Sequence, residues 1–297
     1  MHKSIRRRLV ATYDESGFYN RDNYNNIISA NLDYNLKYVL ALFNSSVLNY
    51  WYTRRFDNVN INPETFRQLP IFPADAATQA ELAGKVDELL AKHAELNRLR
   101  DDGHTIRHKR DGTAEIVVPY DKLLHELQTA DPAYPTLSLF QAQAAGRFTV
   151  LAPGEQSATV SGNVYVPARF PTSLVLRHNR LWLDVPNNDL RRYLQGYLSR
   201  PQWQNQTYDA IKNQAMLPED DDALAAFFAA EAERIARIQT LLADAAALDA
   251  AIDERVLDLY GITDPADRRR ILGSAPPLLA DDEEATLTPQ TEEDDSP

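Results

Sequence analysis

The stretch YWYTRRFDNVNIN, residues 50–62, gathers the side-chain types that proteins use to contact nucleic acids. Aromatic rings can stack on bases, adjacent arginines can hold phosphates, and asparagines can read base edges through paired donors and acceptors. The predicted contacts, first to phosphates and then to bases, are Arg54, Arg55, Tyr52, Asn58 and Asn60. Arg67, which follows this stretch, is a further candidate for DNA contact.

The same stretch also has a structural interpretation, as the end of a helix. Trp51 and Phe56 would then lie in the core. Arg54 and Arg55 would compensate the partial negative charge at the helix C-terminus. Because the residue types fit both interpretations, the sequence leaves both open.

A second basic and aromatic stretch, RRYLQGYLSRPQWQNQTYDAIKNQ, covers residues 191–214. Before it, the sequence RHNR at 177–180 makes a basic turn between two expected strands. Either segment could be ordinary solvated surface or a second contact with DNA. The candidates are Arg177, Arg180, Arg191 and Arg192 for phosphates and Gln202 for bases.

No catalytic motif is recognisable in the sequence. It has no cysteine, which excludes disulfides, thiolate metal sites and a cysteine nucleophile. It also has no GxxxxGK or GxGxxG loop for phosphates. No lysine follows an acidic residue by two positions, as the common metal-dependent nuclease core requires. Pro276–Pro277 lacks the preceding amide and following aromatic residue that hold a flipped adenine in methyltransferases.

Two histidines have a spacing that metal ligands can have. His104 and His108 are four residues apart, but they flank a turn and have no third ligand nearby in the sequence. We interpret them as part of a solvated basic hairpin and predict no metal site. The apolar runs are also shorter than the roughly 18 residues of a membrane span, so we expect no membrane partner. The absence of cysteine fits a reducing compartment, and we expect a cytoplasmic protein.

The formal charge of −12 is unevenly distributed along the chain. Residues 1–72 carry nine basic and six acidic side chains, and residues 161–217 carry seven and three, so both are net positive. Residues 218–297 carry six basic and 21 acidic side chains, a net charge of −15. Eight of these acids lie within 281–295, which we predict to be a disordered tail. The net charge therefore does not exclude DNA as a partner.

Apolar periodicity and capping residues predict several helices. Thr78 and Glu81 form a possible capping box, and Gly261 stands where a helix C-cap is expected. Residues 5–30 are expected to form short strands, and residues 105–186 to be β-rich and irregular. The predicted helices are 35–53, 62–69, 78–100, 189–203, 205–217, 221–259 and 264–272.

These elements predict an α+β fold in which β-rich recognition segments are joined by long, antiparallel, coiled-coil-like spacer helices. The apolar stripe of helix 78–100 is expected to pack against helix 221–259. The predicted segments are a recognition segment 1–73, a spacer helix 74–103, a β-rich insertion 104–188, a second, helical recognition segment 189–217, C-terminal spacer helices 218–275 and an acidic tail 276–297.

Three segments together resemble the TaqI-like C-terminal specificity domain of type II restriction–modification and PglX-type adenine-specific DNA methyltransferases. The first is LFNSS with the following YWYTRR, and the second is the LPIFP step at 69–73. The third, AAIDERVLDLYGITDPADRRRIL at 250–272, is similar to the closing helix of that family. The resemblance covers about residues 1–100 and 189–272.

The resemblance implies recognition of double-stranded DNA in restriction–modification or phage defence. The catalytic domain of the family is missing from this sequence, so whether the chain is an enzyme is left open. The chain itself would bind no cofactor, and S-adenosylmethionine would belong to the missing domain. A methyltransferase catalytic subunit is then the expected protein partner. Alternatively, the chain is an interaction subunit or a non-functional remnant that docks through its helices without reading DNA.

Overall fold

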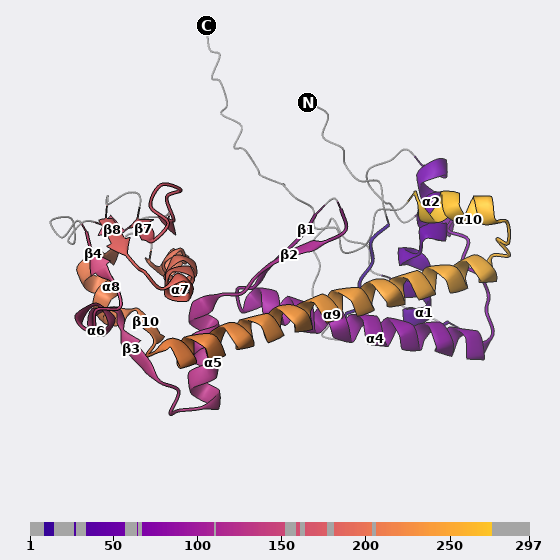
Figure 1. Cartoon of the computed structure of the whole chain (residues 1–297). Helices are drawn as coiled ribbons and strands as arrows, with labels where there is room; N and C mark the ends of the chain where they lie inside the picture. The colour runs from indigo at the N-terminus through magenta and orange to yellow at the C-terminus, as the bar shows by residue number, and fades with distance from the viewer. Residues whose placement is uncertain are drawn as a thin grey trace, which may run out of the picture. The chain divides into compact units, whose positions relative to one another are not determined.

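A computed structural model of the chain combines long helices with small sheets, the predicted α+β class (Figure 1). The residues that it describes are 9–14, 27, 34–56, 64, 67–109, 111–151, 159–160, 164–176, 181–203 and 206–274. Most of the strands expected over 5–30 and half of the helix expected over 62–69 lie outside these residues, and so does the acidic tail; of the described half, Glu64 and Arg67 are helical. Residues 9–14 form no strand.

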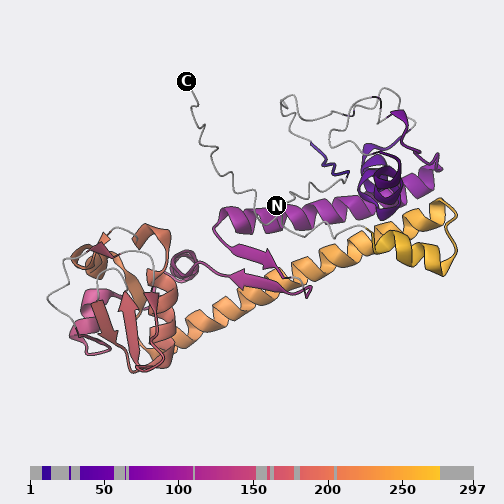
Figure 2. The same ribbon diagram turned by 90° about the horizontal axis from the view of Figure 1, so that it is seen from above.

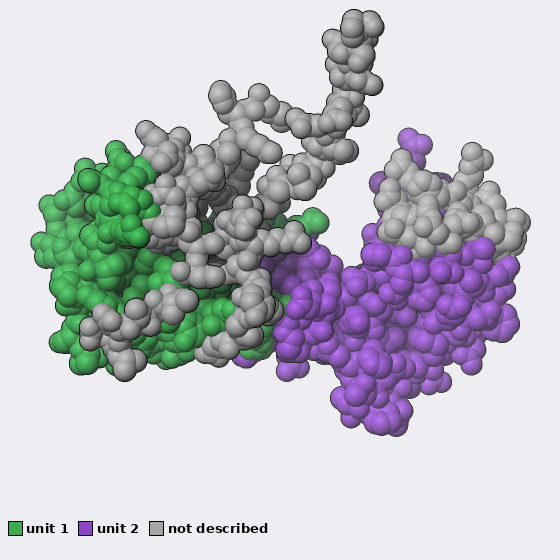
Figure 3. All heavy atoms as spheres, turned by 180° about the vertical axis from the view of Figure 1, so that it is seen from behind, with its two compact units in different colours: residues 1–97, 107–113, 241–297 green, residues 98–106, 114–240 purple. Residues whose placement is uncertain are grey.

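The chain forms two compact units, which Figure 3 colours separately. Two helices contribute to both of them, α4 (Ala76–Asp101) and α9 (Asp221–Leu259). The six segments predicted from the sequence divide the chain more finely, and their boundaries stay a prediction. Unit 1 comprises residues 1–97, 107–113 and 241–297, and unit 2 comprises residues 98–106 and 114–240.

Unit 1 contains two helices where the sequence predicts a single one, α1 (Leu36–Asn44) and α2 (Ser46–Arg55). Ser45 between them has an extended backbone, with φ −65° and ψ 151°. Its hydroxyl donates to the Leu42 carbonyl over 2.7 Å and accepts from the Leu48 N–H over 3.3 Å. Ser45 thus ends α1 and caps α2. The prediction of one helix was wrong because apolar periodicity continues across this break.

Two asparagines attach residues 9–11 to this helix pair. The buried Asn49 accepts a hydrogen bond from the Leu9 N–H at 2.7 Å. Asn44 accepts from the Ala11 N–H and donates to the Ala11 carbonyl, each over 2.9 Å. These side chains satisfy backbone groups of residues that belong to no strand in the described part of the chain.

Asp253 of α9 holds the first turn of α2. One carboxylate oxygen accepts from the Ser46 backbone N–H at 2.7 Å, and the other accepts from the Ser46 hydroxyl at 2.5 Å. A negative charge at a helix N-terminus is also favoured by the helix dipole. The contact therefore fixes where α2 begins relative to α9 within unit 1.

Within unit 1, α4 and α9 lie side by side (Figures 1 and 2). Glu81 pairs with Arg255 at 3.0 Å, and Lys92 pairs with Asp244 at 2.7 Å. Eleven residues forward along α4 thus correspond to eleven residues back along α9, which makes the helices antiparallel. This confirms the predicted packing for the unit 1 parts of both helices. Their shared core includes Leu82, Val86, Ile252, Val256 and Leu257.

The start of α4 differs from the predicted capping box at Thr78. The helix begins at Ala76, and the Asp75 carboxylate accepts from the Thr78 N–H at 2.7 Å. This hydrogen bond lowers the pKa of Asp75. The prediction started the helix two residues late because Asp75 follows a proline-rich stretch and was not considered as a cap.

The predicted end of α9 and the following helix are confirmed. Gly261 has a positive φ of 67°, a left-handed conformation that glycine adopts at no steric cost. Helix α10 (Pro265–Leu272) follows, and its cap Asp264 accepts from the N–H groups of Ala266 and Asp267. Proline at the first helical position fits this start.

The remaining elements belong largely to unit 2, and strand β1 is divided between the units. A four-stranded antiparallel sheet has the order β4-β8-β7-β6, and the other pairs are β1-β2, β3-β10 and β5-β9. The helices are α5 (Tyr120–Ala130), α6 (Leu139–Ala144), α7 (Asn188–Leu198), α8 (Tyr208–Gln214) and the 3-10 turn η3 (Pro201–Trp203). The strands are β1 (Thr105–His108), β2 (Ala114–Val117), β3 (Thr136–Ser138), β4 (Thr149–Val150), β5 (Thr159–Val160), β6 (Val164–Tyr165), β7 (Ser173–Leu176), β8 (Leu181–Asp184), β9 (Gln206–Thr207) and β10 (Met216–Pro218).

Aromatic rings make the centre of the unit 2 core. Tyr120 of α5 stacks on Tyr193 of α7 at 5.7 Å between ring centroids, and Phe227 of α9 meets both rings edge-on. Gly196 makes this approach possible, because a Cβ there would lie 2.6 Å from the Tyr120 ring. The expectation of β-rich structure over 105–186 was incomplete, because α5 and α6 lie within it. The helical spacing of Tyr120, Leu123, Leu124 and Leu127 in α5 was present in the sequence and was overlooked, whereas α6 has only six residues.

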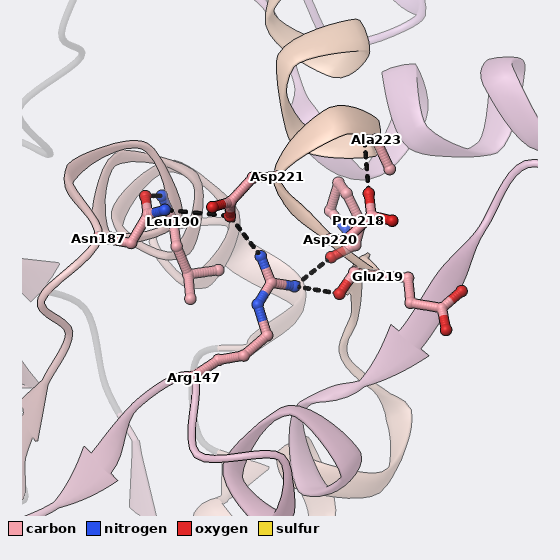
Figure 4. A network of polar contacts seen from close by, with 8 residues as sticks. All are labelled: Arg147, Asn187, Leu190, Pro218, Glu219, Asp220, Asp221 and Ala223. Carbon is pink, nitrogen blue, oxygen red and sulfur yellow. Dashed lines mark hydrogen bonds and ion pairs between the residues drawn. The ribbon is translucent and has the colours of Figure 1, made fainter.

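Within unit 2, Arg147 contacts the residues at the start of α9 (Figure 4). Its guanidinium donates to the carbonyls of Pro218 and Glu219 at 2.5 and 2.8 Å and lies 3.5 Å from the Asp221 carboxylate. The Asn187 amide donates to the same carboxylate at 3.0 Å. These contacts fix the junction between β10 and α9.

Replacing Asp253 by alanine should destabilise unit 1 by about 1–3 kcal/mol, because two charge-assisted hydrogen bonds to Ser46 are lost. Urea unfolding followed by circular dichroism measures this change. Asp244→Ala on the same helix is the matched control, since it removes a more exposed ion pair with Lys92 and should cost about 0.5 kcal/mol. Equal losses in both variants would contradict the assigned role of Asp253.

Candidate nucleic-acid interface

An open groove of about 490 Å³ lies within unit 1, between α2, α10 and the turn that joins α9 to α10. We call it the α2–α10 groove. It brings together side chains from two parts of the chain that are about 200 residues apart. The groove is lined by Val47, Tyr50, Trp51, Arg54, Arg55, Tyr260, Ile262 and Ile271.

Two arginines of the groove lie on aromatic rings one helical turn away. The Arg54 guanidinium carbon is 5.1 Å from the centroid of the Tyr50 ring, and that of Arg55 is 5.5 Å from the Trp51 ring. Both arginines are exposed, and among the described residues neither has an ion pair. A stacked guanidinium keeps its N–H groups free at its edge, where they can donate to a phosphate or to a guanine edge.

The interpretation of residues 50–62 as a helix end is confirmed in part, and their interpretation as a contact with DNA stays a prediction. Trp51 and Phe56 are half-buried and make an edge-on ring contact at 5.7 Å, as the structural interpretation requires. Arg54 and Arg55 lie in the last turn of α2, where positive charge is favourable. The same arginines also point into the groove, so the helix end leaves them available to a ligand.

Tyr52 does not belong to the groove. Its side chain is only 1% exposed and packs against Phe56 at 5.4 Å between ring centroids. The ring has no free face on which a base could stack, so we remove Tyr52 from the candidate contacts. Tyr52 lies four residues, about one helical turn, after the buried Leu48. Both side chains are therefore on the face of α2 that packs into the core.

Two tyrosines hold the LPIFP step beside the groove. Tyr38 donates to the Phe72 carbonyl at 2.7 Å, and Tyr260 donates to the Pro70 carbonyl. Burial raises the pKa of each phenol to about 12, so both stay neutral donors throughout the physiological range. The rings of Tyr260 and Phe72 also contact each other at 5.7 Å. The step thereby fixes the wall of the groove that Tyr260 supplies.

The other predicted contacts are not brought into the α2–α10 groove. Arg67 is 77% exposed and pairs with Glu64 at 3.1 Å. Gln202 is exposed in η3 of unit 2. Four of the predicted residues lie outside the described residues, namely Asn58, Asn60, Arg177 and Arg180.

Arg191 and Arg192 of α7 have partners inside unit 2. Arg191 donates to the Val185 carbonyl at 2.6 Å and to the Asn188 side chain at 2.8 Å. Arg192 pairs with the buried Glu231 and lies 4.1 Å from the centroid of the Phe228 ring. These contacts stabilise the start of α7 and its packing on α9, so their predicted contact with phosphate remains a prediction.

Sequence reasoning missed Tyr260 as a groove residue. Tyr260 lies in the LYG sequence at the end of the closing helix, which is one of the segments that carry the family resemblance. Nothing local links it to Trp51, because only the packing of α10 on α2 places the two in one groove.

No metal site or membrane span is found in the described part of the chain. It contains no group of three or more His, Cys, Asp or Glu side chains placed to hold a metal ion. His104 is buried, and its Nδ1 donates to the Leu99 carbonyl at 2.9 Å, because a carbonyl oxygen only accepts. His104 is therefore part of the core rather than of a solvated hairpin. No helix there is both long and apolar enough to cross a bilayer.

Comparison with known proteins gives one match. Residues 1–71 match the model of the TaqI-like C-terminal specificity domain, about a quarter of the chain. No curated protein and no solved structure matches the chain. The matched residues include α1 and α2, and hence the Ser45 break and both groove arginines. The family match therefore supports a target-recognition function for the segment that carries them.

Tyr52 and the groove arginines should respond very differently to substitution. Tyr52→Ala should lower the free energy of unfolding by about 3–5 kcal/mol, because it empties a site in the core. Arg54→Ala with Arg55→Ala should lower it by only about 1–2 kcal/mol, because two exposed cation–π contacts and a favourable charge at the helix C-terminus are lost. Urea unfolding of each variant measures both effects. A loss for the arginine pair as large as that for Tyr52 would make the arginines structural.

The stability of the protein should decrease when the pH falls below about 6.5, the ordinary pKa of histidine. Burial is the main cause that lowers the pKa of His104 in the folded state, so the unfolded state binds the proton more readily. Stability that is present above the unfolded pKa is therefore lost as the pH falls. His104→Asn can keep the donor to Leu99 and does not titrate, so its unfolding free energy should depend less on pH between 7.5 and 5. An unchanged pH dependence would contradict this role.

Proposed function

We propose that the chain is the DNA target-recognition part of an adenine-specific DNA methyltransferase of restriction–modification or phage defence. The observation that carries the proposal is the α2–α10 groove, whose two stacked arginines belong to the segment that matches a specificity domain. Duplex DNA is the expected ligand. Methyl transfer and S-adenosylmethionine would belong to a catalytic partner.

The groove has the chemistry that such a contact needs. Arg54 and Arg55 offer planar guanidinium groups whose positions are restrained by Tyr50 and Trp51. Phosphates bind well to such groups because two N–H donors can act together. Helix α2 contains no acidic residue, so no carboxylate of that helix competes with a phosphate. Phosphate contacts of this kind orient a protein on DNA, and base contacts would then select the sequence.

The alternative of docking through apolar helix stripes has less support. In unit 1 the stripe of α4 is already covered by α9, as the shared burial of Leu82, Val86, Ile252 and Val256 shows. A partner would have to displace this core in order to use the same side chains. A catalytic subunit would therefore bind another surface of the chain, and the groove remains available for DNA.

Binding of the full chain to duplex DNA of random sequence should be detectable at 50 mM salt and should weaken steeply as salt rises. Replacing both Arg54 and Arg55 by alanine should weaken binding by roughly tenfold or more at 50 mM salt. The slope of log K against log salt should become shallower by about 2, since two phosphate contacts are lost. Fluorescence anisotropy with a labelled duplex measures both quantities.

Arg98→Ala with Arg107→Ala is the control, because it also removes two exposed positive charges outside the groove, one of which, Arg98, pairs with Asp102 at 3.5 Å. This control should leave the affinity within about twofold and the slope unchanged. Undetectable binding of the unmodified chain at 50 mM salt would contradict the proposed function. Equal losses in the two double variants would contradict the assignment to the groove.

A further inference from the structure

The α2–α10 groove is directly connected in sequence to the most acidic segment of the chain. Ile271 lines the groove, and α10 ends one residue later at Leu272. The segment DDEEATLTPQTEEDD at 281–295 carries eight acidic and no basic residues. Its acids form two runs of four that are separated by seven uncharged residues.

Unit 1 carries exposed arginines on the two helices that line the groove, α2 and α10. Arg54 and Arg55 are exposed there, and their described contacts are to aromatic rings rather than to carboxylates. Arg269 in the last turn of α10 is exposed as well, and no ion pair involves it within the described residues. Arg270 beside it pairs with Asp267 of the same helix. Arg54, Arg55 and Arg269 are therefore the arginines that remain for the acidic segment following α10, whereas Arg268 already pairs with Glu254 and Asp258.

The chain between α10 and residues 281–295 is short enough for the acidic segment to reach the α2–α10 groove. Eight residues lie between Leu272 and Asp281, so the nine steps of chain that join them span at most about 30 Å when fully extended. A ligand tethered this closely has an effective concentration of the order of millimolar, so even weak binding is populated. The attraction between exposed charges acts over a Debye length of about 10 Å at 0.1 M salt and fades at higher salt.

We propose that residues 281–295 bind in the α2–α10 groove and occupy its arginines when DNA is absent. The carboxylates accept hydrogen bonds from the Arg54 and Arg55 guanidinium groups, which are otherwise stacked but unpaired in the described structure. The competition with DNA rests on the proposed function, whereas binding of the segment to the groove does not. The bound segment then raises the affinity that DNA needs in order to bind in the groove. DNA with poor base contacts cannot displace the segment, and a site with additional base contacts can.

Direct binding is tested with the full-length chain in which all eight acids of 281–295 are replaced by the corresponding amides. A fluorescein-labelled peptide of residues 275–297 with its native acids is added to this variant. The peptide should bind at 50 mM salt and should bind several-fold more weakly at 200 mM salt. Arg54→Ala with Arg55→Ala in the same background should weaken binding by about tenfold, while the control pair Arg98→Ala with Arg107→Ala should not.

The competition is tested with labelled duplex DNA and no added peptide. The amide variant should bind DNA about three- to tenfold more tightly than the unmodified chain at 50 mM salt, and the two should converge at 300 mM salt. Absence of peptide binding, or equal loss in both arginine pairs, would overturn binding to the groove. If the peptide binds but neither chain binds DNA, the proposed function fails while the contact with the groove stands.

Discussion

The position of helix α2 depends on the break at Ser45 and on its attachment to Asp253. One serine ends α1 and caps α2, and the next residue gives its N–H and hydroxyl to a carboxylate of α9. Since α2 carries Tyr50, Trp51 and both groove arginines, these few hydrogen bonds decide where the groove forms. An uninterrupted helix would direct the same side chains elsewhere, even with an unchanged sequence pattern.

The segments that resemble a specificity domain contain residues that stabilise the structure of unit 1. In the LFNSS stretch, Asn44 binds the backbone of Ala11, Ser45 caps α2, and Ser46 donates to the Asp253 carboxylate. The LPIFP step accepts hydrogen bonds from the tyrosines Tyr38 and Tyr260. Such residues are constrained because each satisfies a polar group that would otherwise be left without a partner. The residues that carry the family resemblance therefore mainly stabilise the fold of unit 1. The exposed arginines at the end of α2 provide the groups that can bind a ligand.

Local charge, rather than the net charge of −12, governs what the groove can bind. Screening limits the influence of distant carboxylates at physiological salt, so Arg54 and Arg55 present a positive surface on an acidic protein. The same reasoning makes the short sequence separation between α10 and residues 281–295 important, because a tether makes it more frequent that these acids come within the roughly 10 Å over which the attraction acts.

The sequence by itself determined the features that depend on neighbouring residues. The bounds of α9, the glycine at its end and the Asp264–Pro265 start of α10 follow from periodicity and capping, which are local. The sequence also singled out Arg54 and Arg55. Tertiary structure alone decided that Tyr52 is buried, that Ser45 interrupts a helix and that Tyr260 joins Trp51 in one groove. These outcomes depend on contacts between residues up to about 200 positions apart, which no local pattern encodes.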